Sequence, residues 1–306
     1  MTPPKIAVAG STGQLALALQ RAALRTGTRL EAIGRPRLDL TQSASVQKFL
    51  DDTSPGIVIN AAAYTAVDKA ESEPGLANAI NAQGPGDLAT ACAARNIPLI
   101  HISTDYVFDG TKSSPYLEVD PVAPLGVYGR SKAEGEDAVR RLNLRHVIVR
   151  TSWIYGPDGS NFVKTMLRLA SERDVIGVVA DQHGAPTRAD DLADALLGLA
   201  TGLNNSPDEN RWGTYHLAGR GETTWHGFAA EIFRHAAEAG LKAPQLNRIT
   251  TSDYPTPARR PAYSVLDQCK AEAALGLKLP DWRDSLAAHF ASLQSPAQLQ
   301  PTRDPA

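Results

Sequence analysis

The stretch Lys5-Ile-Ala-Val-Ala-Gly-Ser-Thr-Gly-Gln-Leu-Ala16 indicates the fold of this chain. Its first part, 5–9, is a short apolar run typical of a buried parallel strand. Two glycines follow in a Gly-x-x-Gly-x-x-Ala pattern that opens an apolar helical pattern. Glycines at a strand end let the backbone turn sharply and approach a pyrophosphate, which the free N–H groups of the helix start then face. Unless this is an ordinary strand–turn–helix without a ligand, the residues expected to meet a dinucleotide cofactor are Gly10, Ser11, Thr12, Gly13, Gln14 and Leu15.

Strand and helix patterns alternate through the first half of the chain. This alternation predicts an α/β fold built on a doubly wound parallel sheet, with helices on both faces. Strands are expected at 5–9, 29–33, 57–61, 99–103 and 146–150, and helices at 13–25, 43–51, 74–95 and 126–142.

The pattern changes after Trp153, where loops lengthen and Gly and Pro recur. We expect 1–152 to form an NAD(P)-binding domain and 153–294 to form mainly a substrate-binding lobe. The segment near 175–200 is expected to return to the first domain, and the polar tail 295–306 to be disordered. A strand is expected at 175–179, and helices at 161–173, 189–202, 225–239 and 283–293.

Composition excludes several classes of protein. The chain has 306 residues, 42% of them hydrophobic, and a net charge of −2, which favours a large core and no nucleic-acid or anionic-membrane partner. No stretch is long and apolar enough to span a bilayer, and the N-terminus lacks a signal-peptide layout. The two cysteines, Cys92 and Cys269, lie far apart and have no metal-ligand spacing. These features together favour a cytoplasmic enzyme.

The end of the second strand bears on the choice of cofactor. An acidic residue there usually holds the adenosine ribose hydroxyls and selects NAD. Gly34-Arg35 occupies that place here, and Arg37 follows. Because an arginine can pair with a 2′-phosphate, we expect NADPH to be preferred, with NADH as the other option; solvated surface charges are the alternative. Asp39 and Leu40 are candidates for contact with the adenine edge.

Three alanines end the third strand, in the segment Asn60-Ala-Ala-Ala-Tyr-Thr-Ala-Val-Asp-Lys-Ala-Glu71. Small residues at the carboxyl end of a strand leave room for a flat group, such as a ribose or a nicotinamide, beside the backbone. Close helix packing is the alternative explanation. The cofactor candidates here are Ala62, Ala63 and Tyr64, and the substrate candidates are Thr65 and Val67.

Tyr128 and Lys132 are four residues apart, so on a helix their side chains lie on one face. The ammonium is expected to favour the phenolate and so to lower the pKa of the tyrosine from about 10. Thr104, at the end of a separate strand, can orient a carbonyl between them. These three residues are the predicted catalytic set.

Four segments together resemble one known family. They are Asn60–Glu71, Ser103-Thr-Asp-Tyr-Val-Phe-Asp-Gly110, Tyr128-Gly-Arg-Ser-Lys132 and Arg150-Thr-Ser-Trp153, and they resemble the dTDP-4-dehydrorhamnose reductases of the extended short-chain dehydrogenase/reductases. Asp181–Thr187 and Arg260–Asp267 resemble the same family, so the match runs from about residue 5 to 290.

The resemblance implies a Rossmann-type sheet domain with a smaller mixed C-terminal substrate lobe. It also implies NAD(P)H-dependent reduction of the C4 ketone of dTDP-4-dehydro-6-deoxy-L-mannose to dTDP-L-rhamnose. In that reaction Tyr128 donates the proton, Lys132 binds the nicotinamide ribose, and Thr104 hydrogen-bonds the ketone oxygen.

The resemblance also implies the residues that contact the sugar nucleotide. Related dehydratases carry a glutamate where this chain has Tyr106, so dehydration is not expected and Tyr106 is expected to line the sugar pocket. Asp105 either bonds a sugar hydroxyl or fixes its loop. Trp153 is expected to stack on the sugar, with a core position as the alternative. The remaining candidates are Asn161, which also suits a helix N-cap, and Arg260, with Arg259 equally available for the diphosphate.

Some members of this family dimerise through magnesium. Here the first helix carries no carboxylate, so a bound metal is not expected, although Asp190 and Asp191 remain weak candidates for Mg²⁺. The oligomeric state is left open between a monomer and a homodimer. Two other functions are retained: a reductase or epimerase of another nucleotide-deoxysugar, and a non-catalytic regulatory subunit. The intact Thr104, Tyr128 and Lys132 favour the enzyme.

Overall fold

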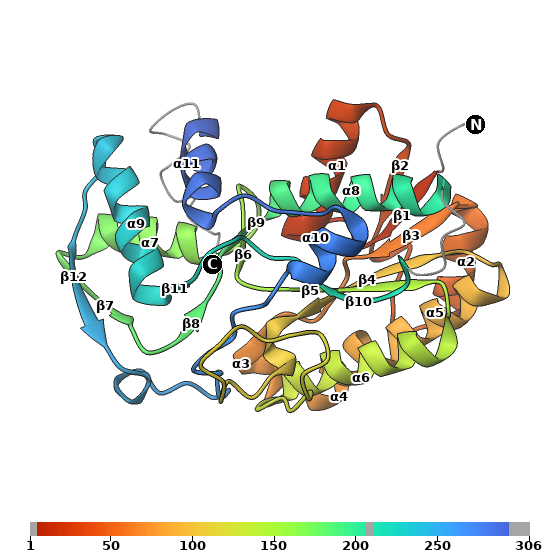
Figure 1. Ribbon diagram of the computed structural model, residues 1–306, viewed down its shortest axis with the longest axis horizontal. Coiled ribbons are helices and arrows are strands. Elements are labelled where there is room, and N and C mark those ends of the chain that lie inside the picture. Colours follow the sequence, from red (N-terminus) through yellow and green to blue (C-terminus); the bar gives the residue numbers. More distant parts are fainter. Residues whose placement is uncertain (1–4, 206–210, 294–306) are drawn as a thin grey trace.

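A parallel sheet between two helical layers forms the larger part of the molecule (Figure 1). The structure is a computed structural model and describes residues 5–205 and 211–293. The sheet has six strands in the order β10-β5-β4-β3-β1-β2, and every neighbouring pair is parallel. Its strands are β1 (Ile6–Ala9), β2 (Leu30–Ile33), β3 (Ile57–Asn60), β4 (Leu99–Thr104), β5 (His146–Thr151) and β10 (Gly213–His216).

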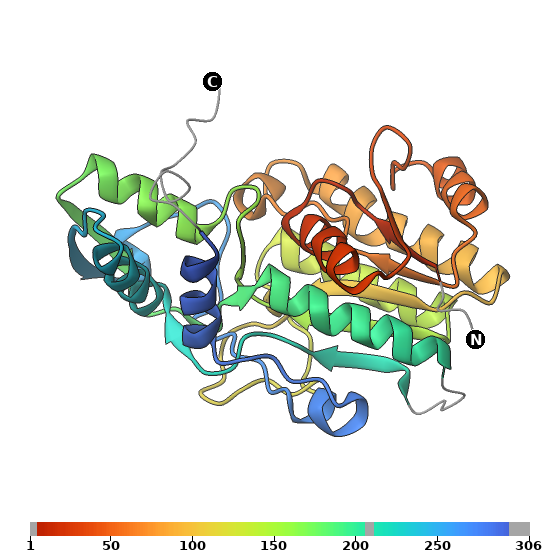
Figure 2. The same cartoon turned by 90° about the horizontal axis from the view of Figure 1, so that it is seen from above.

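The helices cover both faces of the sheet, as the alternating pattern predicts. One face packs against α1 (Gln14–Thr26) and α8 (Ala189–Asn205), which lie together in Figure 2. The other face packs against α2 (Ser43–Thr53), α5 (Gly84–Ala94) and α6 (Val127–Leu142). Buried aliphatic side chains alternate between the two faces along each strand, so each face has its own core. The prediction of an α/β fold with a parallel sheet is confirmed.

Two elements differ from the sequence prediction. The sixth strand, β10, was not expected, because it has only four residues, begins at Gly213 and buries only its last two. The single helix expected at 74–95 is divided into α4 (Pro74–Asn78), a π-helical segment η1 (Ala79–Gln83) and α5. Within η1 the buried Asn81 side chain bonds the backbone N–H and C=O of Tyr64, at 2.8 and 3.0 Å. This contact between distant segments has no local sequence signal.

A smaller lobe lies beside the sheet (Figures 1 and 2). Its core joins α7 (Phe162–Glu172), α9 (Trp225–Glu238) and α11 (Trp282–Ser292) to the strands β7 (Val175–Val179) and β12 (Gln245–Ile249), which pair in parallel. Short two-stranded sheets, β6 (Ile154–Tyr155) with β9 (Thr187–Arg188) and β8 (His183–Gly184) with β11 (Thr223–Thr224), lie between the parts. Further short helical elements of the described chain are α3 (Val67–Ala70), η2 (Asp105–Val107), η4 (Thr251–Asp253) and α10 (Cys269–Leu275).

The segment 175–200 contributes to both parts. Its strand β7 pairs with β12 and lies apart from the six-stranded sheet, whereas its helix α8 packs against α1. The tail 295–306 lies outside the described residues.

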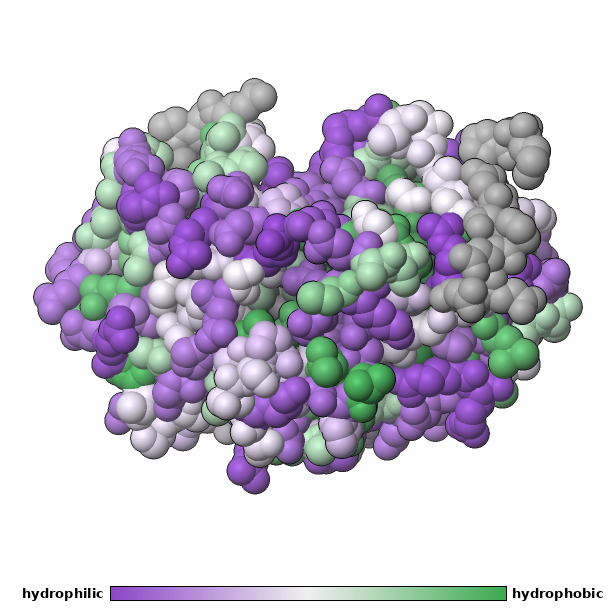
Figure 3. Space-filling view, in the orientation of Figure 1, coloured by the Kyte–Doolittle hydropathy of each residue, from purple (hydrophilic) through white to green (hydrophobic). Residues whose placement is uncertain are grey.

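The surface in Figure 3 is mostly hydrophilic, with apolar residues in small separate groups. Among the described helices, none has the length and apolar character needed to cross a membrane.

Candidate functional site

The three predicted catalytic side chains meet at the carboxyl edge of the sheet. Thr104 is the last residue of β4, and Tyr128 and Lys132 lie on the first two turns of α6. The Thr104 hydroxyl lies near enough to Tyr128 to influence its pKa, and the Tyr128 ring lies edge-on to Tyr106, with 6.0 Å between ring centroids. The side chains that sequence spacing places on one helix face therefore converge with a hydroxyl from a separate strand.

The pKa of Tyr128 differs from the sequence expectation. Burial is the main cause that raises this pKa to about 12; the nearby Thr104 hydroxyl acts against the shift and the Asp105 carboxyl acts with it. The expected lowering by Lys132 is therefore corrected: the Lys132 amino group is directed at β4, where Nζ donates to the carbonyl oxygen of Ile102 at 2.6 Å. Tyr128 is accordingly protonated at neutral pH.

Lys132 is itself buried, with 2% of its surface exposed. Burial lowers its pKa to about 8, and the carboxylate of Glu136, one turn further along α6, acts against that shift. Glu136 is held by a two-pronged ion pair with Arg150 of β5, at 2.9 and 2.7 Å, in which both side chains are buried. A lysine in this setting keeps its charge at pH 7 but exchanges its proton easily.

Asp105 follows Thr104 in a short 3₁₀ helix, η2 (Asp105–Val107). The Thr104 hydroxyl donates to Asp105 Oδ1 at 3.0 Å and accepts from the backbone N–H of Tyr106 at 3.2 Å. Burial raises the pKa of Asp105 to about 7, although the nearby Ser264 and Thr104 hydroxyls act in the opposite direction. Near neutral pH this carboxyl is therefore present in both its neutral and its charged form.

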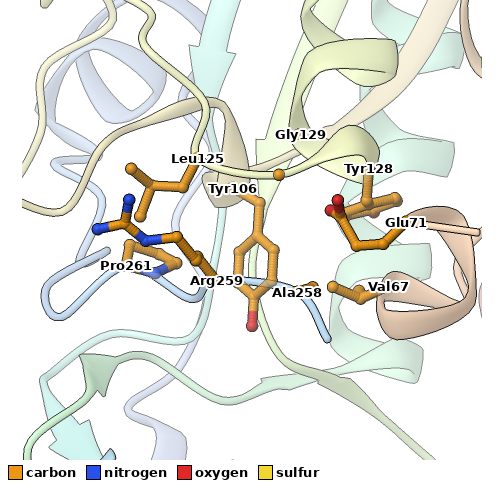
Figure 4. Close-up of a pocket in the computed structure, with 10 residues that line it drawn as sticks. Val67, Glu71, Tyr106, Leu125, Tyr128, Gly129, Ala258, Arg259 and Pro261 are labelled. Atoms are coloured by element: carbon orange, nitrogen blue, oxygen red, sulfur yellow. The ribbon is translucent and has the colours of Figure 1, made fainter. Parts of the chain in front are cut away.

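The start of α6 is held in place by contacts that sequence reasoning did not identify as functional. Glu71 Oε1 accepts from the backbone N–H of Val127, the first residue of α6, at 2.7 Å. Gly129 packs so tightly that a Cβ there would lie 2.2 Å from the carbonyl oxygen of Tyr106. Figure 4 shows the Tyr106 ring between Val67 and Glu71 on one side and Arg259 and Pro261 on the other. The only sequence signal for Glu71 is its place at the end of the segment that begins at Asn60.

The glycine turn leaves space for a dinucleotide. Gly10 adopts a φ of +108°, and a Cβ there would come within 3.2 Å of the backbone nitrogen of Ala62. Gly13 faces open space, because a Cβ at that position would meet no atom within 4 Å. Ser11, Thr12 and Gln14 are half-buried or exposed, whereas the Leu15 side chain belongs to the core, so only its backbone is available to a ligand.

The end of β2 presents an exposed arginine. Arg35 has no ion pair among the described residues, whereas Arg37 lies 3.7 Å from Glu31. Asp39 Oδ1 accepts from the N–H of Thr41 at 2.9 Å, which lowers the pKa of this carboxyl. Leu40 is buried in the core, so its side chain does not face a ligand.

The segment after β3 reaches from the glycine turn to Tyr106. Ala62 and Ala63 are half-buried, and Val67 lines the small cavity in Figure 4 together with Tyr128. Thr65 is exposed, and the Tyr64 hydroxyl donates to Glu73 at 2.8 Å.

Trp153 and Asn161 both make contacts within the protein. The Trp153 ring stacks on Trp225, with 3.5 Å between ring centroids and 8° between planes, and it packs against Gly184. Asn161 caps α7 by accepting from the N–H of Lys164 at 3.1 Å, and its amide nitrogen donates to Gln14 at 3.0 Å. The N-cap alternative for Asn161 is thus realised, and the same side chain joins α7 to the glycine turn.

Arg260 is engaged in an ion pair that links the lobes. Its Nη2 donates to Asp68 Oδ2 of α3 at 2.8 Å, and the other carboxylate oxygen accepts from the N–H of Ala258. Arg259 is exposed, and its guanidinium points away from Tyr106 in Figure 4.

The two weak candidates for metal binding, Asp190 and Asp191, form ion pairs with arginines. Arg21 of α1 bonds Asp190 Oδ1 through Nη2 at 2.7 Å and also pairs with Asp158, while Arg188 lies 3.3 Å from Asp191. The described residues contain no cluster of three or more His, Cys, Asp or Glu side chains suited to a metal ion.

Comparison with known proteins identifies the family. A family model described as the RmlD substrate binding domain matches residues 4–295. A dTDP-4-dehydrorhamnose reductase of Sinorhizobium fredii is 47% identical over 281 residues, which cover 92% of this chain and 95% of that protein. The crystal structure of a dTDP-4-dehydrorhamnose reductase from Clostridium acetobutylicum superposes with a TM-score of 0.88 at 40% identity and covers 95% of this chain and 99% of that one.

A second solved structure contains a cofactor. The dTDP-4-dehydrorhamnose reductase of Bacillus anthracis in complex with NADP has a TM-score of 0.88 at 36% identity and covers 95% of this chain and all of that one (100%). The chain therefore belongs to the dTDP-4-dehydrorhamnose reductase family, which the RmlD substrate binding domain model describes.

Proposed function

We propose that the protein reduces the C4 ketone of dTDP-4-dehydro-6-deoxy-L-mannose to dTDP-L-rhamnose, with NADPH or NADH as reductant. The observation that carries this proposal is the convergence of the Tyr128 side chain, at the start of α6, with the Thr104 hydroxyl, at the end of β4, and with the buried Lys132 one turn further along α6. Family membership supports the same reaction, because the curated relatives carry the reductase name.

A reduced nicotinamide cofactor, when bound, supplies the hydride that goes to C4. The glycine turn fits such a group, because Gly10 lets β1 approach β3 closely and Gly13 leaves open space at the start of α1. As C4 gains the hydride, the carbonyl oxygen takes a proton from the Tyr128 hydroxyl. The high pKa of Tyr128 keeps that proton in place until the oxygen becomes basic. Thr104 donates a hydrogen bond to the same oxygen, and Lys132 would hold the nicotinamide ribose.

We assign the cofactor to one part of the molecule and the substrate to the space between both parts. Residues 1–152, with α8 packed on their sheet, hold the cofactor, and 153–294 form mainly the substrate lobe, although several substrate contacts come from 1–152. The cofactor contacts are Gly10, Ser11, Thr12, Gly13, Gln14, Leu15, Arg35, Asp39, Leu40, Ala62, Ala63, Tyr64, Tyr128 and Lys132, with Leu15 and Leu40 acting through their backbone. The substrate contacts are Thr65, Val67, Thr104, Asp105, Tyr106, Trp153, Asn161 and Arg260.

Arg35 supports a preference for NADPH. It is exposed at the end of β2, carries no ion pair among the described residues and lies close enough to act on Asp39 electrostatically. A 2′-phosphate suits this position, because a guanidinium pairs with phosphate through two parallel hydrogen bonds. Arg35→Gln should therefore raise the KM for NADPH and leave that for NADH unchanged.

The direct test combines the purified protein with dTDP-4-dehydro-6-deoxy-L-mannose and NADPH or NADH. The expected result is oxidation of the cofactor with formation of one equivalent of dTDP-L-rhamnose, identified by chromatography and mass spectrometry. Other nucleotide-linked 4-keto-deoxysugars serve as controls for substrate choice. A folded protein that binds the cofactor but turns over none of these ketones would sink the proposal and favour a regulatory subunit.

A further inference from the structure

Lys132 faces a buried histidine that the proposed reaction does not use. His101 lies on β4 with none of its surface exposed, and its Nε2 is 3.4 Å from Lys132 Nζ. The same Nζ donates to the carbonyl oxygen of Ile102 at 2.6 Å. Which ring nitrogen of His101 carries the proton therefore affects how readily Lys132 gives up its own proton.

Asn60, at the end of β3, determines where that proton lies. The N–H of Ala62 donates to Asn60 Oδ1 at 3.2 Å, and the Asn60 amide nitrogen lies 3.1 Å from His101 Nδ1. A backbone N–H can only donate, so the amide oxygen must face Ala62 and the amide nitrogen must face His101. His101 Nδ1 then accepts, and the hydrogen-bond network assigns the ring proton to Nε2.

The Nε2–H group consequently points towards Lys132. A charged ammonium and an N–H group repel each other at this distance, whereas a neutral amine offers a lone pair that accepts from Nε2–H. The pKa of His101 lies well below its usual value, because the ring is buried beside Lys132, so the ring itself stays neutral. This arrangement acts in the same direction as burial, which lowers the pKa of Lys132 to about 8.

Other charges around the pair are few. Glu136 favours the charged form of Lys132, and it is itself paired with Arg150. The positive groups that act on His101 are Lys132, Arg140 and His146.

We propose that Asn60 and His101 are positioning residues for Lys132, and that the tautomer imposed by Asn60 makes Lys132 release its proton more readily. The proposal rests on the proposed function, in which Tyr128 must regain a proton after each turnover. A lysine one turn away that exchanges its proton near neutral pH suits that step. Asn60, the first residue of the segment Asn60–Glu71, would then act on Lys132 through His101 and not on the substrate.

The tautomer can be observed without any turnover. Heteronuclear NMR of the full-length protein, labelled in the histidine ring nitrogens, distinguishes Nε2–H from Nδ1–H imidazole. His101 is assigned by the loss of its signals in His101→Gln or by their shift in Asn60→Asp. The expected result is a neutral Nε2–H ring across the neutral pH range. A Nδ1–H ring in the wild type overturns the proposal, whatever the substrate proves to be.

A double-mutant cycle tests the effect on Lys132. In Asn60→Asp the carboxylate accepts from Nδ1–H, which switches the tautomer and turns the Nε2 lone pair towards the ammonium. The alkaline limb of kcat/KM should then move upward by about 1 pH unit. In the His101→Gln background the same substitution adds only its charge, so the shift should be much smaller. Equal shifts in both backgrounds would show a charge effect alone and contradict the proposal; cofactor binding and thermal melting confirm that each variant is folded.

Discussion

The Thr104 hydroxyl makes two hydrogen bonds within the protein. It donates to Asp105 and accepts from the N–H of Tyr106. Because a hydroxyl has one proton, Thr104 can bond the substrate oxygen only when it releases Asp105. A neutral Asp105 carboxyl, which can itself donate, makes that exchange easier.

Thr104→Val keeps the shape of the side chain and removes the hydroxyl. We expect kcat/KM to fall by about a hundredfold, because the developing negative charge on the ketone oxygen loses a donor. Thr104→Ser is the matched control and should retain most of the activity. Steady-state kinetics of both variants check this, and equal losses in the two would show that the methyl group, not the hydroxyl, is what matters.

Asp105 should make the stability of the protein depend on pH. Its pKa in the folded protein is about 7, above the usual 3.8, so the folded state binds a proton more tightly than the unfolded chain. The free energy of unfolding therefore falls as pH rises from about 4 to about 7. The Asn side chain does not titrate, so Asp105→Asn does not lose this free energy as pH rises. The melting temperature of the variant relative to that of the wild type should therefore increase from about pH 5 to about pH 8.

Asp284, an exposed carboxylate on α11, provides the control for this experiment. Asp284→Asn removes one exposed carboxylate in the same way, so its melting temperature at about pH 5 and about pH 8 shows how much of any change follows from the loss of a surface charge alone. If Asp105→Asn behaved like that control, the raised pKa of Asp105 would be refuted.

At the scale of elements, the segment from Asn60 to Glu71 connects the parts of the site. Asn60 bonds His101 of β4, Asp68 pairs with Arg260 of the second lobe, and Glu71 caps α6. Its polar residues thus have structural partners far away in sequence.

Glu71 should affect catalysis through the position of α6. Glu71→Ala leaves the N–H of Val127 without its partner, and we expect kcat to fall about tenfold because Tyr128 is misplaced. Glu71→Gln keeps a side-chain acceptor and should restore most of kcat. Binding of NADPH, measured by fluorescence, should be similar in both variants. A Gln variant as impaired as the Ala variant would instead indicate that the charge of Glu71 acts directly.

The regular elements follow from the sequence because their signals are local. Five strands of the large sheet and its main helices carry clear apolar patterns. Each of these elements lies within three residues of its predicted bounds, apart from the helix expected at 74–95, which is divided. The π-helical segment and β10 were missed because Asn81 and Gly213 are placed by partners that are distant in sequence.

At the scale of the whole molecule, side-chain contacts join the two lobes around the site. Arg260 reaches Asp68, Arg21 reaches Asp158, and Asn161 reaches Gln14. Because these contacts border both the glycine turn and the Tyr106 cavity, the binding of either ligand depends on the fit between the lobes.

Asp68→Asn should weaken substrate binding more than turnover. The charged hydrogen bond to Arg260 is lost, so we expect the KM for the sugar nucleotide to rise about tenfold, with a smaller change in kcat. Lys69→Gln is the control, because it changes one charge on the same helix in a pair with Glu73 that stays within the first lobe. Kinetics that are alike in the two variants would refute a role for the contact between the lobes.

The site could be predicted from the sequence only in part. Thr104, Tyr128 and Lys132 stand in recognisable motifs, and the structure brings them together. The roles of His101 and Trp225 could not be read in advance, because each depends on one partner that the fold brings from elsewhere. The pKa of Tyr128 was expected to fall because spacing reveals a nearby cation, but neither the burial of the phenol nor the direction of the Lys132 amino group towards β4.

The central claim is that Tyr128 protonates the ketone oxygen as C4 is reduced. The most direct measurement compares the wild type with Tyr128→Phe under saturating NADPH and dTDP-4-dehydro-6-deoxy-L-mannose, with the cofactor affinity of each determined separately. We predict that the substitution lowers kcat by about a thousandfold and leaves the dissociation constant for NADPH within about twofold of the wild type. A Phe variant that reduces the ketone at nearly the wild-type rate would contradict the account.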